Sequence, residues 1–454
     1  MMTTPCCRTR RFLAIALLPL LLGPAIAHPA SAADIKPRQP NILFLLADDQ
    51  RWDTIRALGN QEIQTPQLDG LVERGFHFTN AYCMGGMIAA VCTPSRTMIA
   101  TGRSLWHIPD WKTTKTAPPG MPLLPLSMAG AGYVTFHCGK RGNECSYANA
   151  TYATNIELDG RTAESATDSA DHTLTFLRGH DPQRPFFIYL APPVPHDPRL
   201  APAEFTRLYD PATIKLSPNF LAQHPFDNGW LTGRDEVLAP HPRTPEVMRQ
   251  HLADYYATIS HFDQQVGRIL DLLRERGLLD NTIVVYSSDQ GLAVGGRHGL
   301  MGKQNLYEHV KPPLIFAGPG IPRGKSDALV YLFDLYPTFC ELAGAPTPKS
   351  LEGHSLLGIV QGREQRGRDE LLAAFMHTQR MLRDERWKLI EYNVSGVKHS
   401  QLFDLSRDPD ELHNLADDPR FAAERASLEE RMTRARHEYN DPVDFTASNP
   451  KPAS

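Results

Sequence analysis

A continuous apolar stretch at residues 41–47 ends directly in two aspartates, Asp48 and Asp49. Because its apolar residues do not alternate with polar ones, the stretch predicts a strand buried on both faces, as in a parallel sheet covered by helices. Sheets of this kind bind ligands beyond the carboxyl ends of their strands. Neighbouring carboxylates repel one another, so this pair favours a bound cation, and oxygen ligands favour calcium or magnesium over zinc. A solvated turn is the alternative.

Three further apolar stretches also end in polar residues. They are residues 132–138 followed by Lys140, residues 185–191 followed by His196, and residues 282–287 followed by Asp289 and Gln290. A fifth strand is predicted at residues 313–317, and a helix at residues 251–276, where apolar residues recur at three- and four-residue steps. Strands that alternate with crossover segments predict an α/β fold with a doubly wound, mostly parallel sheet flanked by helices.

The pattern changes near residue 366. Short apolar segments at 380–383, 387–392 and 401–405 predict strands, and residues 421–439 predict an amphipathic helix. We therefore predict a principal α/β domain at 34–365, a smaller C-terminal α+β subdomain at 366–445 and a flexible tail at 446–454. Residues 200–245 are rich in Pro, Asp and His and show no steady period, which predicts a long surface insertion of the kind that often selects substrate.

The first 33 residues have the pattern of a secretory signal peptide. Three arginines precede an apolar segment at residues 12–26, which is short for a membrane span and interrupted by two prolines, and small residues follow at 30–32. We therefore predict cleavage of residues 1–33 and a periplasmic or secreted mature protein. An uncleaved anchor is the alternative. Since no second long apolar stretch follows, no stable membrane anchor is expected after signal cleavage.

The charge balance is acidic, with 47 Lys and Arg against 51 Asp and Glu. Loss of the signal peptide would remove three arginines and no acid, which makes the mature chain more acidic. Binding to nucleic acid depends on a basic surface, so nucleic acid is not an expected partner. The cysteines beyond the signal peptide are too few for a disulfide scaffold, and whether Cys138 pairs with Cys145 stays open.

Residues 92–96, Cys-Thr-Pro-Ser-Arg, predict the start of a helix. Thr93 is a suitable N-cap, Pro94 is a suitable first helical residue, and Gly102 is expected to end the helix. Cys92 then lies at a helix N-terminus, where backbone N–H groups favour an anion, and Arg96 adds a positive charge one turn later. A lone cysteine is more often a small core residue, so this motif depends on support from the rest of the chain.

The polar strand ends and the cysteine motif together resemble the type I, formylglycine-dependent sulfatases of the alkaline phosphatase-like superfamily, over nearly the whole mature chain. The matching segments are Asn41-Ile42-Leu43 with Asp48-Asp49, Cys92-Thr93-Pro94-Ser95-Arg96, Gly132-Tyr133 with Gly139-Lys140, Pro195-His196, Ser288-Asp289-Gln290-Gly291 with Gly302-Lys303, and Leu402-Phe403-Asp404-Leu405. The resemblance implies that residues 34–365 are a sulfatase catalytic domain and that the protein hydrolyses a sulfuric ester.

The resemblance also implies a role for each matching residue. The implied ligands of one calcium ion are Asp48, Asp49, Asp289, Gln290 and the modified side chain of Cys92. A formylglycine-generating enzyme is implied as the partner that converts Cys92 to formylglycine, and Arg96 is implied to steady that residue. Lys140 and Lys303 are implied to bind the sulfate and His196 to protonate the leaving group. His298, in the loop before Lys303, is expected to bind substrate, with a structural role as the alternative.

In the chemistry of this family, one hydroxyl of the hydrated aldehyde is polarised by the metal and attacks sulfur. The second hydroxyl then expels sulfate and restores the aldehyde, while His196 is implied to protonate the departing oxygen. One departure is visible. Members usually read Gly-Lys-x-His, whereas this chain has Gly142 at the His position. That His serves the hydrate, so its absence predicts slower release of sulfate unless His137 or Arg141 compensates.

The sequence therefore predicts a secreted sulfatase whose substrate is a sulfated small molecule or saccharide, with carbohydrate favoured by family analogy and by the extracytoplasmic address. A phosphonate monoester or phosphodiester hydrolase is one alternative, because it can share the fold, the metal and the cysteine motif. An inactive relative that binds sulfated glycans is another, suggested by Gly142. A cysteine hydrolase fits poorly, because no His with Asn or Asp is indicated as a partner for Cys92.

Overall fold

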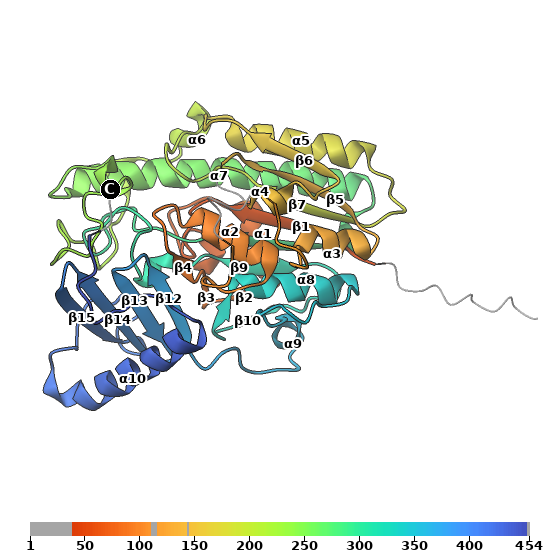
Figure 1. The fold of residues 1–454 in the computed structure, drawn as a ribbon. Coiled ribbons are helices and arrows are strands. Elements are labelled where there is room, and N and C mark those ends of the chain that lie inside the picture. The colour runs from red at the N-terminus through yellow and green to blue at the C-terminus, as the bar shows by residue number, and fades with distance from the viewer. Residues whose placement is uncertain (1–38, 110–115, 143–144, 452–454) are drawn as a thin grey trace, which may run out of the picture. The chain divides into compact units, whose positions relative to one another are not determined.

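A computed structural model of the chain describes residues 39–109, 116–142 and 145–451 (Figure 1). The predicted signal peptide, residues 1–33, lies outside the described residues, as do the last three residues of the predicted tail. A search of the described helices finds none that is both long enough and apolar enough to cross a membrane.

The principal sheet has eight strands. They are β1 (Asn41–Ala47), β2 (Phe76–Phe78), β5 (Val134–Lys140), β6 (Thr154–Leu158), β7 (Phe186–Ala191), β8 (Thr282–Ser288), β9 (Leu314–Ala317) and β10 (Gly324–Ser326). Their order is β10-β2-β9-β8-β1-β7-β5-β6. The five strands from β8 to β6 run parallel, and β9 runs antiparallel to both of its neighbours. The predicted mostly parallel sheet is therefore confirmed, with the fifth predicted strand reversed in direction.

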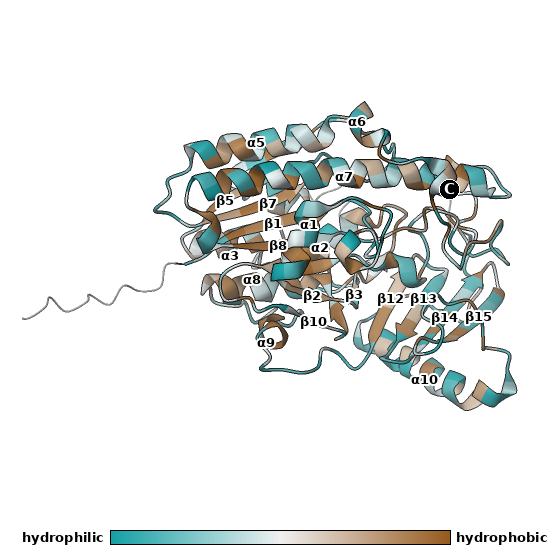
Figure 2. Cartoon of the chain, turned by 180° about the vertical axis from the view of Figure 1, so that it is seen from behind, coloured by the Kyte–Doolittle hydropathy of each residue, from teal (hydrophilic) through white to brown (hydrophobic). Residues whose placement is uncertain are grey.

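Helices cover both faces of this sheet. On β1, Leu43 and Leu45 belong to one core cluster and Ile42 and Phe44 to another, so successive side chains point to opposite faces. The first cluster is covered by α1 (Pro66–Arg74), α5 (Ser165–Gly179) and α7 (Pro245–Glu275), and the second by α2 (Cys92–Thr101), α3 (Leu124–Gly130) and α8 (Leu335–Ala343). Figure 2 shows hydrophobic strands between helices whose outer faces are more hydrophilic. The doubly wound α/β arrangement is confirmed.

Two helix boundaries differ from the sequence prediction. Helix α7 begins at Pro245 rather than 251, because Thr244 caps its first turn by accepting the Val247 N–H at 3.4 Å, whereas the apolar stripe starts later. Helix α2 begins at Cys92 itself, with Val91 and not Thr93 at the N-cap position. It ends at Gly102 as predicted, where φ of 64° is left-handed and suits glycine.

A second sheet forms the C-terminal subdomain. Its strands are β4 (Gly85–Gly86), β12 (Leu371–Phe375), β13 (Gln379–Arg383), β14 (Trp387–Val394) and β15 (Val397–Asp404), in the order β15-β14-β13-β12-β4. Helix α10 (Ala422–Glu438) packs against β12, β13 and β14. The predicted α+β character is confirmed, whereas the boundary at residue 365 stays a prediction. Strand β4, which was not predicted from the sequence, pairs in parallel with β12.

The remaining elements are short. They are β3 (Ala81–Tyr82), β11 (Val330–Tyr331), α4 (Ser146–Asn149), α6 (Ala203–Thr206) and α9 (Leu357–Val360). Between α6 and α7 the chain forms only 3-10 turns at Pro211–Thr213 and Glu236–Leu238. The predicted insertion at 200–245 therefore has little regular structure, and part of it reaches the candidate site.

Gly85 lies on β4 opposite Ala374 of β12 and gives a test of that pairing. Its φ is 91°, and a Cβ placed there would lie 1.9 Å from the carbonyl oxygen of Ala374 on β12. Gly132 has a similar φ of 93° but open space around it. We expect Gly132→Ala to cost only the left-handed strain, about 1–2 kcal/mol, and Gly85→Ala to cost clearly more in urea unfolding. Equal losses would show that the β4–β12 pairing contributes nothing to stability.

Candidate active site

The acidic residues meet because β1 and β8 are parallel neighbours in register, with Ala47 opposite Ser288. The next residues of each strand, Asp48–Asp49 and Asp289–Gln290, therefore leave the sheet at the same edge. The Asp49 N–H donates to Asp289 Oδ1 at 3.0 Å, which ties the two strand ends together. Asp49 has a positive φ of 73°, a conformation that aspartate tolerates better than most residues.

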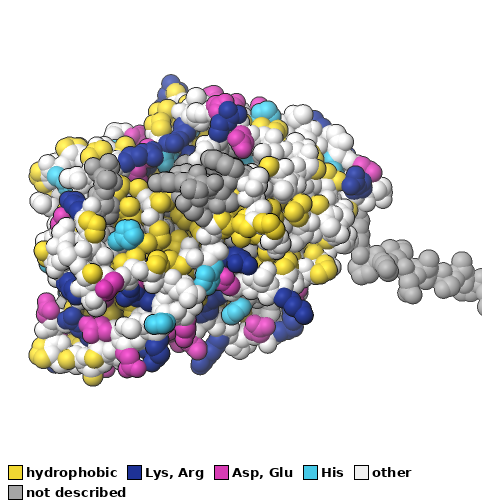
Figure 3. All heavy atoms as spheres, in the orientation of Figure 1, with side chains coloured by type: hydrophobic (Ala, Val, Ile, Leu, Met, Phe, Trp, Pro, Cys, Tyr) yellow, Lys and Arg dark blue, Asp and Glu magenta, His cyan; other side chains and the backbone are white. Residues whose placement is uncertain are grey.

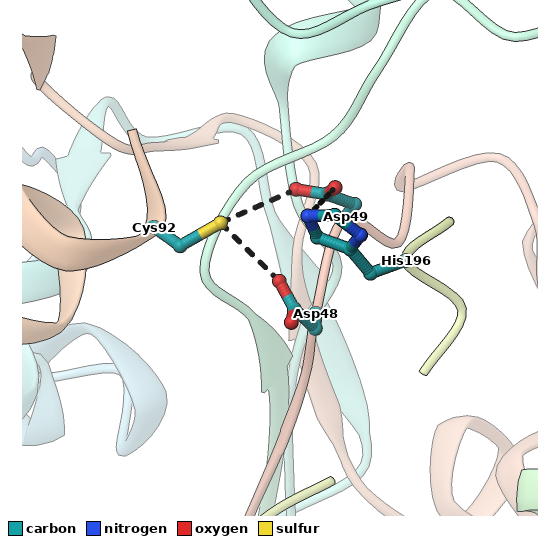
Figure 4. A group of neighbouring side chains, drawn as sticks. All are labelled: Asp48, Asp49, Cys92 and His196. Atoms are coloured by element: carbon teal, nitrogen blue, oxygen red, sulfur yellow. Dashed lines mark hydrogen bonds and ion pairs between the residues drawn. The ribbon is translucent and has the colours of Figure 1, made fainter. Parts of the chain in front are cut away.

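Cys92 faces these carboxylates from the first turn of α2. Its Sγ lies 3.3 Å from Asp48 Oδ1 and 3.7 Å from Asp49 Oδ1, and Figure 4 shows the thiol pointing at both carboxylates, with His196 beside Asp49. The Nζ of Lys303 lies 3.3 Å from the same sulfur. The structure therefore brings together residues from five separate segments of the chain.

Three buried cations balance the three buried acids. Lys140 Nζ donates to Asp48 Oδ2 at 2.6 Å, and Lys303 Nζ donates to Asp49 Oδ2 at 2.8 Å. Arg96 Nε donates to Asp289 Oδ2 at 3.0 Å. All six side chains are buried, so each charge depends on its neighbours rather than on water.

Burial and neighbouring charge shift the acids in opposite directions. Burial by itself raises the pKa of Asp48, but Lys140 and then His196 outweigh it and hold that pKa well below its usual value. Asp289 keeps a raised pKa of about 6, because burial and the nearby Asp48 outweigh Arg96. Burial, followed by the charges of Asp289 and Asp48, raises the pKa of the Cys92 thiol well above normal. An unmodified thiol here is therefore a poor nucleophile, which weighs against a cysteine hydrolase.

His196 presents one nitrogen to the cluster. Its Nδ1 lies 2.7 Å from the carbonyl oxygen of Asp197 and 3.0 Å from Asp197 Oδ1, so two acceptors assign the hydrogen to Nδ1. Its Nε2 lies 3.6 Å from Asp49 Oδ2. Burial raises the pKa of Asp197, but its hydrogen bond with His196 and the positive charges around it lower that pKa overall. Asp197 therefore stays ionised and accepts the hydrogen on Nδ1.

The donor set fits a hard cation. One ligand atom from each of Asp48, Asp49, Cys92 and His196 lies within 4.8 Å of the others. The amide group of Gln290 lies 2.9 Å from Asp49 Oδ1, and turning that amide over would present its oxygen to the same point. The carboxylates of Asp48 and Asp49 and the amide oxygen of Gln290 are oxygen ligands of the kind that calcium and magnesium prefer.

His298 lies in a different cluster. Its Nε2 is 3.0 Å from Glu308 Oε2 and 3.1 Å from Asn219 Nδ2, and its ring stacks on Tyr307 with 3.9 Å between centroids. Together with Glu308 and His309 it forms a second buried group of potential ligands. These contacts hold in place the loop that carries Lys303, which is the structural role named above as the alternative for His298. The predicted contact of His298 with substrate stays a prediction.

The position of Gly142 is open and its backbone is left-handed. Its φ is 87°, and a Cβ added there would meet nothing within 4 Å. The Arg141 side chain points to the surface, where its Nε lies 3.5 Å from Glu157 Oε2 and 3.1 Å from Asp159 Oδ1. His137 is buried on β5, its Nδ1 lies 2.7 Å from Asn155 Oδ1, and burial lowers its pKa to about 4. The described contacts of Cys92 include neither of these two side chains.

Three polar residues next to the cluster were not assigned by sequence reasoning. Asp197 follows His196 directly in the sequence, and this adjacency could have indicated that Asp197 lies next to the cluster. Arg234 and Asp235 come from the irregular insertion at 200–245, where no periodic pattern singles them out. Asp235 Oδ2 lies 3.9 Å from Lys303 Nζ, and Arg234 contacts Asp197.

Comparison with known proteins identifies the family. The sequence profile described as Sulfatase matches residues 40–345, which is more than half of the chain and includes the whole cluster. The chain belongs to the sulfatase family. A second profile, described as N-sulphoglucosamine sulphohydrolase, C-terminal, matches residues 296–438. The predicted family and its enzyme class, the sulfuric ester hydrolases, are thereby confirmed.

Relatives of the chain are similar over most of their length. N-acetylglucosamine-6-O-sulfatase of Bacteroides thetaiotaomicron is 24% identical over 517 residues, covering 94% of this chain and 91% of its own. Arylsulfatase K of Bos taurus is 27% identical over 470 residues, covering 90% of this chain and 85% of its own.

Solved structures share the fold. A protein in complex with its substrate D-glucosamine-2-N,6-O-disulfate has a TM-score of 0.73 at 22% identity, covering 91% of this chain and 100% of its own. Phosphonate monoester hydrolase of Agrobacterium radiobacter has a TM-score of 0.75 at 20% identity, covering 88% of this chain and 96% of its own. Both sulfatases and phosphonate hydrolases therefore use this architecture, and structural likeness alone does not choose between them.

The pairing of Arg96 with Asp289 gives a test of the charge balance. In Arg96→Met a buried carboxylate loses its cation, which typically costs about 3–5 kcal/mol. Arg96→Lys keeps the positive charge and should cost less. Unfolding is best measured in chelator, because a bound cation would replace part of the lost charge. Equal losses for the two variants would mean that packing, and not charge, is what Arg96 contributes.

Proposed function

We propose that this sulfatase hydrolyses a sulfate ester of a carbohydrate, using formylglycine made from Cys92 and one calcium ion. The observation that carries the proposal is the position of Cys92, whose Sγ lies within 3.7 Å of two carboxylates and 3.3 Å from a lysine. The proposed ligands of the calcium ion are Asp48, Asp49, Asp289, Gln290 and the side chain of residue 92. The modified residue supplies the nucleophilic hydroxyl and the ion supplies positive charge.

Lys140 and Lys303 are the proposed sulfate clamp. Their ammonium groups now donate to Asp48 and Asp49, so both are already directed to the point where the carboxylates and residue 92 converge. With a cation bound, these carboxylates would be neutralised, and the two ammonium groups could bind sulfate oxygens. Positive groups fixed in a buried site stabilise charge that develops on the transferred group.

His196 is the proposed general acid. Asp197 holds Nδ1–H, which leaves Nε2 facing the cluster to deliver a proton to the departing oxygen. Arg161 NH1 donates to the carbonyl oxygen of Asp197, which also accepts from His196 Nδ1, so charged groups from two segments lie on the outer side of the ring. This arrangement orients the ring so that Nε2 faces Asp49.

The substrate class is inferred from relatives. One relative is an N-acetylglucosamine-6-O-sulfatase, and one similar structure holds its substrate D-glucosamine-2-N,6-O-disulfate, so we propose a sulfated saccharide as substrate. We further propose a periplasmic or secreted location, on the basis of residues 1–33, and a formylglycine-generating enzyme as the maturation partner. A phosphonate monoester hydrolase is the second candidate, because one such enzyme has the same fold with a TM-score of 0.75.

Formylglycine at position 92 is the first prediction of this proposal. Tryptic cleavage gives the peptide 75–96, and mass spectrometry of active enzyme should show formylglycine at 92. Cys92→Ala should be folded and inactive. Cys83→Ala is the matched control, because Cys83 is a buried cysteine in the same peptide and should leave the modification in place. Full activity with an unmodified thiol at 92 would refute the mechanism.

The same preparation separates the two candidate functions. A sulfatase should turn over an aryl sulfate faster than the matching aryl phosphonate monoester or phosphodiester, and the second candidate should show the reverse preference. Absence of turnover on all of these esters, with formylglycine and calcium both present, would favour the inactive glycan-binding alternative.

Calcium dependence is the second prediction. Chelation should lower both activity and the melting temperature, because a ligand that binds only the folded state stabilises it, by about 2.7 kcal/mol at a concentration 100 times its Kd. Calcium should restore both. Asp289→Asn should lower the calcium content measured by elemental analysis, whereas Asp53→Asn, a carboxylate paired with Arg297 outside the cluster, should not. Normal calcium in Asp289→Asn would contradict the ligand assignment.

A further inference from the structure

Two arginines converge on Asp197 at the rim of the site. Arg234 NH2 donates to Asp197 Oδ2 at 2.9 Å, and Arg161 NH1 lies 3.9 Å from the same oxygen. The side chain of Arg234 is 53% exposed and that of Arg161 is 25% exposed, whereas His196 and Cys92 are fully buried. The two guanidinium groups therefore lie nearer to solvent than the buried site does, and Asp197 is the carboxylate that they share.

Arg234 is connected to the site on two sides. Through Asp197 it reaches His196, since Asp197 Oδ1 is 3.0 Å from His196 Nδ1. Its Nε also lies 3.9 Å from Asp235 Oδ1, and Asp235 Oδ2 lies 3.9 Å from Lys303 Nζ. Arg234 therefore lies next to two acids, Asp197 and Asp235. Asp197 contacts the proposed general acid His196, and Asp235 lies near Lys303 of the proposed clamp.

The backbone around Arg234 is held in place. The Glu236 carboxylate accepts the Gly302 N–H at 2.8 Å and pairs with Arg243 at 2.6 Å. Asp235 accepts Gln304 Nε2 at 2.8 Å. These contacts fix the insertion to the loop that carries Lys303, so Arg234 keeps a defined position relative to the site.

The free donors of Arg234 suit an oxyanion. A guanidinium carries five N–H donors in a planar fork, and one hydrogen bond to Asp197 leaves most of them available. Such a fork recognises a carboxylate or a sulfate with two parallel hydrogen bonds. On the face shown in Figure 3, the coloured Lys and Arg side chains are interspersed with Asp and Glu and form no continuous basic surface. Recognition of an anion through Arg234 would therefore be local to the rim.

We propose that Arg234, supported by Arg161, binds a second anionic group of the saccharide, next to the sulfate ester that is cleaved. The substrates are then polyanionic sugars, which carry a uronic carboxylate or another sulfate beside the reacting one. This inference rests on the proposed function, since it names the substrate class of the same site. It also gives the irregular insertion at 200–245 a proposed role in substrate binding.

Turnover of paired substrates tests this subsite. One pair is glucosamine 2-N,6-O-disulfate with N-acetylglucosamine 6-sulfate, and the other is a sulfated, uronate-containing disaccharide with its carboxyl-reduced form. The quantity compared is the ratio of kcat/KM within each pair. Hydrogen bonds to charged groups contribute about 1.5–3 kcal/mol, so Arg234→Gln should lower this ratio about 10–100-fold, mainly through KM. The pair that responds identifies the second anion as sulfate or carboxylate.

Two further variants make the result specific. Arg234→Lys keeps the charge but not the fork, so it should recover only part of the ratio. Arg207→Gln, at an exposed arginine of the same insertion, should leave the ratio unchanged. An unchanged ratio in Arg234→Gln, even with lower overall turnover, would overturn the subsite and leave Arg234 as a support for Asp197 and His196.

Binding to Cys92→Ala separates this inference from the proposed function, because it needs no turnover. Calorimetry should show tighter binding of the member of each pair with the extra anion, and Arg234→Gln in the same background should remove that difference. This result would support the subsite even if no ester were hydrolysed. Equal binding of both members to Cys92→Ala would overturn the subsite while leaving the sulfatase proposal intact.

Discussion

Three buried carboxylates at the end of a parallel sheet are the constraint on which the site depends. The in-register pairing of β1 with β8 places Asp49 and Asp289 at one edge, where the Asp49 backbone donates to the other carboxylate. Burial of several like charges is unfavourable unless cations compensate them. Lys140, Lys303 and Arg96 supply that compensation, although they come from a strand end, a loop and a helix. The fold thus brings distant segments together to balance one group of charges.

Local sequence signals predicted the central part of this fold well. The apolar stretch at 41–47 is strand β1 residue for residue, because a strand buried on both faces is visible in its own composition. The short strands β2 and β4 were not predicted, since each depends on a partner far away in sequence. Strand β6 was also not predicted, because it lies at the edge of the sheet and has no continuous apolar stretch. Strand β4, which is only two glycines, is a strand because it lies beside β12.

The candidate site was predictable where a residue follows a strand directly or belongs to a recognisable motif. Cys92 lies beside Asp48 and Asp49. His298 lies near Lys303 in the chain but contacts Glu308 and Tyr307, and its predicted contact with substrate stays a prediction. Arg234 was not predictable. It comes from a segment without periodicity, and only the anchoring of that segment through Glu236 brings it to the rim.

The contacts of the two lysines link cation binding to anion binding in the proposed enzyme. The carboxylates that Lys303 and Lys140 contact compete with a sulfate for these ammonium groups, because they repel a sulfate brought to the same point. A cation that neutralised the carboxylates would remove this competition and raise the affinity of the lysines for an anion. Linkage then requires that a bound anion raise cation affinity by the same factor.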